Sequence, residues 1–88
     1  MIVTFSKQFS KQLDWLNDQS MLQRISRAVQ QVIAAKSAQE ITNLKKLQGH
    51  SSAYRIRIGD YRIGLFIEGN AVLFAFLGHR RNIYNQFP

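Results

Sequence analysis

The 88-residue sequence predicts an α+β protein in which two helices pack on one face of an antiparallel β-meander. Two observations predict this class. Apolar residues recur at helical spacing in the first half of the chain, whereas they alternate with a period of two after Tyr54. The length suits one modest hydrophobic core and is too short for a second folded unit, so we expect residues 1–88 to form a single domain.

The first half of the chain carries the patterns of one strand and two helices. The β-branched and aromatic run Ile2–Phe5 predicts a short N-terminal strand, and Ser6 is a suitable N-cap for a helix over residues 7–17. After the polar break NDQS, a second helix is expected to run to about Ala35, so the two form an αα-hairpin. The two apolar stripes are Phe9, Leu13 and Leu16, and then Leu22, Ile25, Val29, Val32 and Ile33. Residues 36–50 fit either a helical turn or a packed connector.

Three strands are expected in the segments YRIRI, YRIGLFIE and AVLFAFLG. They are separated by Gly59-Asp60 and Gly69-Asn70, which are typical two-residue hairpin turns. These turns set the register, which places Arg57 opposite Arg62, and Gly64 opposite Ala75. One face is then apolar and forms the core beneath the helices. It consists of Tyr54, Ile56, Ile58, Tyr61, Ile63, Leu65, Ile67, Val72, Phe74 and Phe76.

The opposite face of the meander carries three arginines, Arg55, Arg57 and Arg62. Like charges directly opposite each other destabilise a sheet by up to about 1 kcal/mol, so folding alone does not explain an Arg57–Arg62 pair. A bound phosphodiester would explain it, because guanidinium groups are bidentate and permanently charged donors. We expect Gly64 and Ala75 to leave room for such a ligand. For any one arginine, a solvated strand position is the simpler interpretation.

Composition favours a polyanionic partner. Twelve Lys and Arg against five Asp and Glu give a net charge of +7, and residues 45–88 hold seven of these basic groups but only two of the acidic ones. Nucleic acid is the usual partner of so basic a domain. Because there is no cysteine and only two histidines are present, we expect neither a metal site nor a cofactor. No apolar run has the length of a membrane span, which favours a cytoplasmic protein with no membrane partner.

Three segments carry a specific resemblance to a known family: LKKLQGH at 44–50, YRIRIGDYRI at 54–63 and LGHRRNIY at 77–84. They resemble the RelE/ParE superfamily of bacterial toxins, and within it the RelE-like mRNA interferases. The order of strand, helices and meander is similar over nearly the whole chain. The resemblance implies a ribosome-dependent endoribonuclease of a type II toxin-antitoxin pair, which cuts mRNA in the ribosomal A site. It also implies a cognate antitoxin as partner, with operator DNA contacted only through the antitoxin complex.

The resemblance assigns roles by position. The implied catalytic residues are Arg57, Arg62, Arg80 and Tyr84, and Arg55 is implied to guide the RNA backbone. The family pattern does not nominate the remaining candidates, but they lie beside these positions in the basic half of the chain, and we expect them to bind RNA: Lys45, Lys46, His79 and Arg81. Arginine stands where relatives often carry strand lysines, and with a pKa above about 12 it does not act as a base. The general base that removes the ribose 2′-OH proton is therefore left open.

Several alternatives stay open from the sequence. The exposed apolar strip Phe66, Leu73 and Leu77 is a candidate antitoxin-binding surface, and an open strand edge or the surface around Trp15 would serve equally. A ParE-like inhibitor of DNA gyrase would share the fold, although that branch generally lacks the full set of basic and tyrosine positions. A non-catalytic RNA-binding or antitoxin-binding protein is the third possibility.

Overall fold

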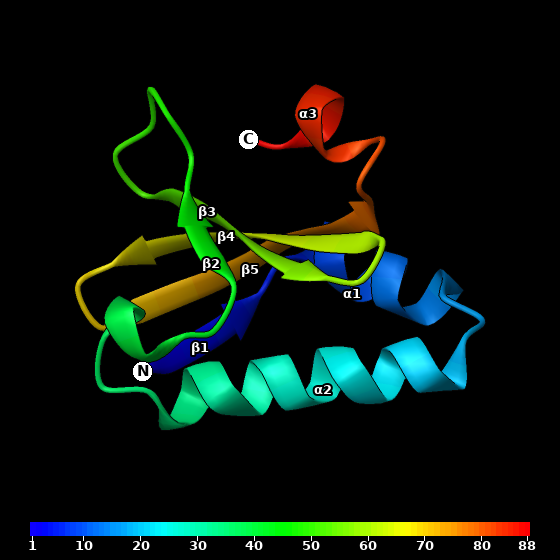
Figure 1. Ribbon diagram of the computed structural model, residues 1–88, viewed down its shortest axis with the longest axis horizontal. Coiled ribbons are helices and arrows are strands. Elements are labelled where there is room, and N and C mark those ends of the chain that lie inside the picture. Colours follow the sequence, from blue (N-terminus) through cyan, green and yellow to red (C-terminus); the bar gives the residue numbers. More distant parts are fainter.

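A computed structural model describes residues 1–88 as one five-stranded sheet with helices on both sides (Figure 1). The elements are β1 (Ile2–Phe5), α1 (Lys7–Trp15), α2 (Gln19–Ala34), a short 3-10 helix (Ala38–Glu40), β2 (Leu44–Lys46), β3 (Ala53–Ile58), β4 (Tyr61–Glu68), β5 (Ala71–His79) and α3 (Ile83–Gln86). The strand order is β1-β5-β4-β3-β2, with β1 parallel to β5 and the other neighbours antiparallel. The predicted α+β class and the meander are confirmed.

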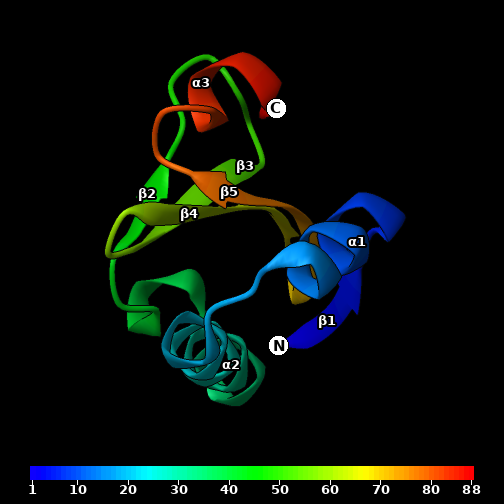
Figure 2. The same ribbon diagram turned by 90° about the vertical axis from the view of Figure 1, so that its right-hand side faces the viewer.

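Helices α1 and α2 begin at side-chain caps and cover one face of the sheet. Ser6 Oγ accepts a hydrogen bond from the Phe9 N–H at 3.0 Å, and Asp18 Oδ1 accepts one from the Met21 N–H at 3.0 Å. Each cap satisfies a backbone donor that the first helical turn leaves unpaired. Figure 2 shows α2 on one side of the sheet and the short α3 on the other.

The main core lies between these two helices and the sheet. Its most deeply buried members come from α1, α2 and the three meander strands, as the apolar pattern predicts: Phe9, Ile25, Val32, Ile56, Ile63, Leu65, Val72 and Phe74. The rings of Phe9 and Phe74 lie 5.6 Å apart between centroids, so α1 is held directly on β5.

The register of the meander is as predicted between β3 and β4 but shifts between β4 and β5. Arg57 pairs with Arg62, whereas Gly64 pairs with Phe76 and Ile63 with Leu77. The predicted pairing of Gly64 with Ala75 is therefore wrong. A β-bulge inserts one residue into β5, which moves every later side chain to the opposite face.

Helix α1 and its cap hydrogen-bond the backbone groups at this bulge. Ser6 Oγ donates a hydrogen bond to the Ala75 carbonyl at 3.1 Å, and Gln12 Oε1 accepts one from the Leu77 N–H at 2.7 Å. Because a bulge interrupts the ladder, such groups need partners from elsewhere in the fold.

Because of the bulge, the predicted positions of two side chains are wrong. Leu77 was expected in the exposed apolar strip, but it lies in the main core with 3% of its surface exposed. Phe76 was expected in the main core, but it lies on the opposite face. There it forms a second small cluster with Ala53, Ile83 and Phe87.

This second cluster also changes the environment of Gly64. A Cβ placed on Gly64 would lie 2.6 Å from the Phe87 ring, so the C-terminal segment occupies the space that was expected to receive a ligand. The open part of this face is therefore the end that carries the arginines.

Residues 36–50 contain a strand that the sequence does not reveal. Leu44–Lys46 form β2, which pairs antiparallel with β3 and places Lys45 opposite Arg55. Asn43, with φ of 63°, turns the chain into this strand in the left-handed conformation that asparagine tolerates. None of the helices has the length and apolar character needed to cross a membrane.

Candidate active site

A concave site of about 340 Å³ lies on the open face where β2, β3 and β4 meet. Its lining residues are Asn43, Leu44, Lys45, Arg55, Arg57 and Arg62. Strand alternation and register bring the basic members together, because Lys45 pairs with Arg55 and Arg57 pairs with Arg62. The pairing of like charges that the sequence predicts is confirmed.

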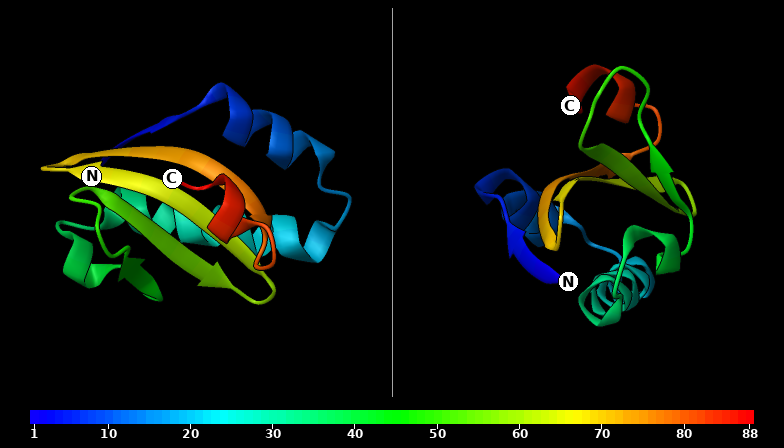
Figure 3. Two further views of the ribbon diagram at one scale, coloured as in Figure 1. Left: turned by 90° about the horizontal axis from the view of Figure 1, so that it is seen from above. Right: turned by 90° about the vertical axis from the view of Figure 1, so that its left-hand side faces the viewer.

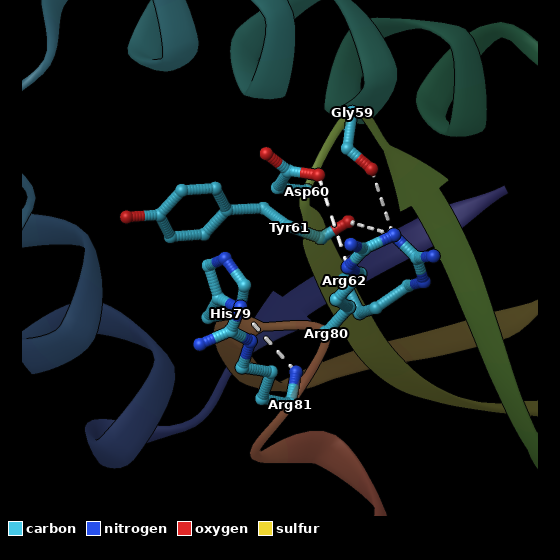
Figure 4. Close-up of polar contacts among 7 residues, drawn as sticks. All are labelled: Gly59, Asp60, Tyr61, Arg62, His79, Arg80 and Arg81. Atoms are coloured by element: carbon cyan, nitrogen blue, oxygen red, sulfur yellow. Dashed lines mark hydrogen bonds and ion pairs between the residues drawn. The ribbon is translucent and has the colours of Figure 1, made fainter.

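Arg62 is held in a defined orientation within this site. Its Nη1 atom donates hydrogen bonds to the carbonyl oxygens of Gly59 at 2.8 Å and Tyr61 at 2.9 Å (Figure 4). Burial lowers the pKa of Arg62 from its ordinary value, and the positive charges of Arg55, Arg57 and Arg80 lower it further. A guanidinium group in such surroundings gains from a bound anion, because the anion offsets both effects.

Arg80 reaches the same site from the segment after β5. Its backbone N–H donates a hydrogen bond to the Asp60 carbonyl at 2.7 Å, which fixes the chain beside the β3–β4 turn. Its Nε lies 3.9 Å from Asp60 Oδ1, and both side chains are exposed (Figure 4). An exposed pair at this distance contributes little and leaves most of the Arg80 charge available.

Tyr84 completes the group from α3. The residue is 75% exposed, and the guanidinium carbon of Arg55 lies 5.3 Å from the centroid of its ring. The Arg55 side chain lowers the pKa of Tyr84, first as a hydrogen-bond donor to the phenol and then through its positive charge, and Arg62 and Lys45 add smaller effects. The phenol is therefore more readily deprotonated than a free tyrosine.

The predicted site residues thus fall into two groups. Arg55, Arg57, Arg62, Arg80, Tyr84 and Lys45 come together on the open face. Lys46 and His79 pair with Tyr54 and Tyr61, so the pleat directs both toward the helix-covered side. The His79 and Tyr61 rings lie 5.9 Å apart in an edge-to-face arrangement. Arg81 is exposed, and its backbone N–H donates a hydrogen bond to His79 Nδ1 at 3.3 Å.

Sequence reasoning missed two groups of residues beside this site. Gln48 and His50 line an adjoining cleft, and their only signal was their place in LKKLQGH. Arg24 and Arg27 of α2 line a third hollow, which they share with Arg57. No carboxylate forms an ion pair with either arginine, so positive charge continues around the β3 side of the sheet.

The apolar strip expected to bind an antitoxin is only partly exposed. Leu73 retains 37% of its surface, whereas the Phe66 ring packs against Phe87 with centroids 5.1 Å apart. Both line a groove of about 320 Å³ beside the edge strand β1, where Ile2 is also exposed. The groove is mainly apolar.

Solved structures share this fold. A chain of the RelB–RelE antitoxin–toxin complex from Methanococcus jannaschii superposes with a TM-score of 0.78 at 32% identity, covering 96% of this chain and 98% of that chain. A chain of the archaeal RelE–RelB complex from Pyrococcus horikoshii gives 0.73 at 24% identity, with 90% and 93% covered. The YoeB dimer from Staphylococcus aureus gives 0.74 at 19% identity, with 91% and 97% covered. The class is that of the small RelE-like toxins.

Sequence comparison identifies the family. The model of the ParE toxin of type II toxin-antitoxin system, parDE, matches residues 3–84. Toxin RelE3 of Methanocaldococcus jannaschii is 34% identical over 89 residues, which cover the whole of both chains. The chain belongs to the RelE/ParE superfamily of type II toxin-antitoxin toxins, as its motifs predict.

Proposed function

We propose that the protein is a ribosome-dependent endoribonuclease that cleaves mRNA in the ribosomal A site and so inhibits translation. The observation that supports this most strongly is the cluster of Arg55, Arg57, Arg62 and Arg80 beside Tyr84 on the open face. Only Asp60 forms an ion pair with any of these guanidinium groups, and that contact is long and exposed. Such a cluster suits a phosphodiester, because several bidentate donors converge on one anionic group.

The reaction is an attack of the ribose 2′-OH on the adjacent phosphorus. The bond to the 5′-oxygen of the next nucleotide breaks, which leaves a 2′,3′-cyclic phosphate and a 5′-OH. Negative charge builds on the phosphoryl oxygens during this step, and we assign its stabilisation to Arg62 and Arg80, whose charges lie close enough to affect each other. Arg57 stands opposite Arg62 and contributes a further donor.

Tyr84 is the proposed general base. Arginine side chains stay protonated at neutral pH, whereas Arg55 lowers the pKa of Tyr84 and thereby increases the fraction of phenolate. The phenolate takes the 2′-OH proton, and water protonates the leaving 5′-oxygen while Arg80 hydrogen-bonds to it. Tyr84 then returns its proton to solvent. No step requires a metal ion.

We further propose a cognate antitoxin as partner. Two of the similar structures are complexes of RelE with RelB. The groove beside β1 that includes Phe66 and Leu73 offers an apolar surface for such a chain. Leu77 is buried in the core and takes no direct part in this surface. Contact with operator DNA would then run through the antitoxin.

The test is primer extension on a translated reporter mRNA after brief induction. Wild type is compared with Arg62→Ala, Tyr84→Phe and the control Gln30→Ala, whose side chain is exposed on α2. In the wild type and in Gln30→Ala, we expect cuts that appear only during translation and fall at in-frame codon positions. Arg62→Ala and Tyr84→Phe should strongly reduce these cuts. Growth arrest with intact mRNA would contradict the proposed nuclease activity.

Inhibition of DNA gyrase is the second candidate, because the matching family model describes ParE toxins. A supercoiling assay with purified protein separates the two. Inhibition of gyrase at low protein concentration, together with intact mRNA in induced cells, would favour this candidate.

A further inference from the structure

A cleft of about 490 Å³ lies beside the candidate active site. It is formed between the β2–β3 loop, residues 47–52, and α3 with the C-terminal segment. Figures 1 and 3 show the loop and α3 rising side by side from the same face of the sheet. A volume of this size is in the range of pockets that bind small organic ligands.

The lining of the cleft suits a flat heteroaromatic group. Leu47, Ile83 and Phe87 line its apolar base, where Ile83 and Phe87 are largely buried, and the exposed Tyr84 forms the wall that a flat group can stack on. Unstacked RNA bases are commonly bound in this way, on aromatic or guanidinium planes with their edges hydrogen-bonded. The cleft therefore combines a stacking surface with side chains that form hydrogen bonds.

The cleft and the candidate active site are continuous. Lys45 and Arg55 line both, so one basic wall runs from the arginine cluster into the cleft. A strand whose phosphate lies at Arg57 and Arg62 would place the next base beside Arg55 and Tyr84. The geometry favours the nucleotide adjacent to the scissile phosphate as the occupant.

The loop presents two further polar side chains, Gln48 and His50, to the cleft. Gly49 between them adopts φ of 79°, a left-handed conformation that reverses the chain direction locally. The loop is tied at its ends, because the Leu47 N–H donates to the Ala53 carbonyl and the Ile67 N–H donates to the Ser52 carbonyl, each at 2.9 Å. Glutamine carries a donor and an acceptor side by side, the arrangement that pairs with a base edge.

We propose that this cleft binds a single unstacked RNA base and that Gln48 and His50 select its identity by hydrogen bonding to its edge. The proposal rests on the proposed action on RNA. It assigns the loop a role in sequence preference that is separate from cleavage, because neither side chain lines the concave site of the arginine cluster.

Binding is measured first, independently of cleavage. The purified toxin is titrated by NMR with four 2′-O-methyl RNA trinucleotides that differ only in the central base, since the blocked 2′-oxygen prevents reaction. We expect the Gln48 and His50 side-chain signals to shift, with dissociation constants that differ by about fivefold or more between the best and the worst base. Gln48→Ala and His50→Ala should level this difference, whereas Gln30→Ala should keep it. Unchanged loop signals, or a preference that survives in both loop variants, would overturn the proposal.

Cut-site sequencing in induced cells then separates this inference from the nuclease itself. We expect both loop variants to cleave mRNA with a weaker base bias next to the cut than the wild type shows. Cleavage with an unaltered bias in both variants would overturn base selection and leave the nuclease standing. Base-selective binding without any cleavage would support base recognition by the cleft and contradict the proposed nuclease activity.

Discussion

Arg55 holds its guanidinium carbon 5.3 Å from the centroid of the Tyr84 ring, so strand β3 and the C-terminal helix meet over the candidate active site. The contact has a consequence for pH dependence, because Arg55 lowers the pKa of Tyr84 as a hydrogen-bond donor and through its charge. A base with a lowered pKa is deprotonated at lower pH. The rate of cleavage should therefore rise with pH and reach its plateau at a pH below 10.0, the ordinary pKa of tyrosine.

Arg55→Gln tests this relationship directly. Removing the charged donor raises the pKa of Tyr84 toward its ordinary value, so the rising limb of the pH profile should move to higher pH. Tyr84→Phe should abolish the limb. The measurement is the rate of mRNA cleavage on purified ribosomes across the neutral and alkaline range at constant ionic strength. An Arg55→Gln profile that is lower at every pH but unmoved would contradict Tyr84 as the base.

Arg57 and Arg62 stand directly opposite each other, and neither forms an ion pair with a carboxylate. Arg57→Gln should therefore raise the free energy of unfolding by a few tenths to about 1 kcal/mol. The same change should lower cleavage by about 10²-fold or more, because a donor to the phosphoryl oxygens is lost. Urea denaturation measures the expected gain in stability, and the ribosome assay measures the expected loss of cleavage.

Lys36→Gln is the matched control for this prediction. It removes one positive charge from an exposed position outside the arginine cluster, so its effect on stability should stay within about 0.5 kcal/mol. Added salt should shrink the gain of Arg57→Gln, because screening weakens the repulsion. A loss of stability in Arg57→Gln would show that the arginine pair does not repel in the folded state.

The sequence predicts the β3–β4 hairpin because a two-residue turn with a glycine leaves one register. Gly59 adopts φ of 57° there, as such a turn requires. The bulge in β5 cannot be predicted from the sequence because Phe76 and Leu77 are both apolar, and either suits a buried position. Strand β2 cannot be predicted either, because three residues that include two lysines carry no alternating apolar pattern.

The grouping of the arginines on one face is more predictable than its surroundings. It follows from the register that the turn sets, and from the position of Arg80, which leaves β5 beside the β3–β4 turn. The fold-back of Phe87 onto Gly64 was missed, since one aromatic residue near the end of a chain does not reveal what it covers. The Gln48 and His50 cleft depends on that fold-back and was missed with it.

Gln12 should contribute to stability through the bulge in β5. Its Oε1 atom accepts the 2.7 Å hydrogen bond from the Leu77 N–H, a donor that is partly buried. Gln12→Ala leaves this donor unpaired, which should cost about 1–3 kcal/mol of unfolding free energy. Gln8→Ala on the exposed side of α1 is the control and should have little effect. Equal urea midpoints for the two variants would contradict the role of Gln12.

Gly64→Ala should displace the C-terminal segment. The added Cβ would lie 2.6 Å from carbon atoms of the Phe87 ring, and such overpacking costs about 1–3 kcal/mol. Because Phe87 directly follows the helix that carries Tyr84, its displacement should also separate Tyr84 from Arg55 and reduce cleavage. Urea denaturation and the ribosome assay report the two losses.

A double-mutant cycle with Phe87→Ala identifies the cause. Without the ring, an alanine at position 64 loses its three tightest contacts, all of them with Phe87, and in a strand alanine is favoured over glycine by roughly 0.5–1 kcal/mol. Gly64→Ala should therefore be neutral or stabilising in the Phe87→Ala background, although it is destabilising in the wild type. If the two losses simply add, Phe87 does not lie over Gly64 in solution, and the wall of the Gln48 and His50 cleft is formed differently.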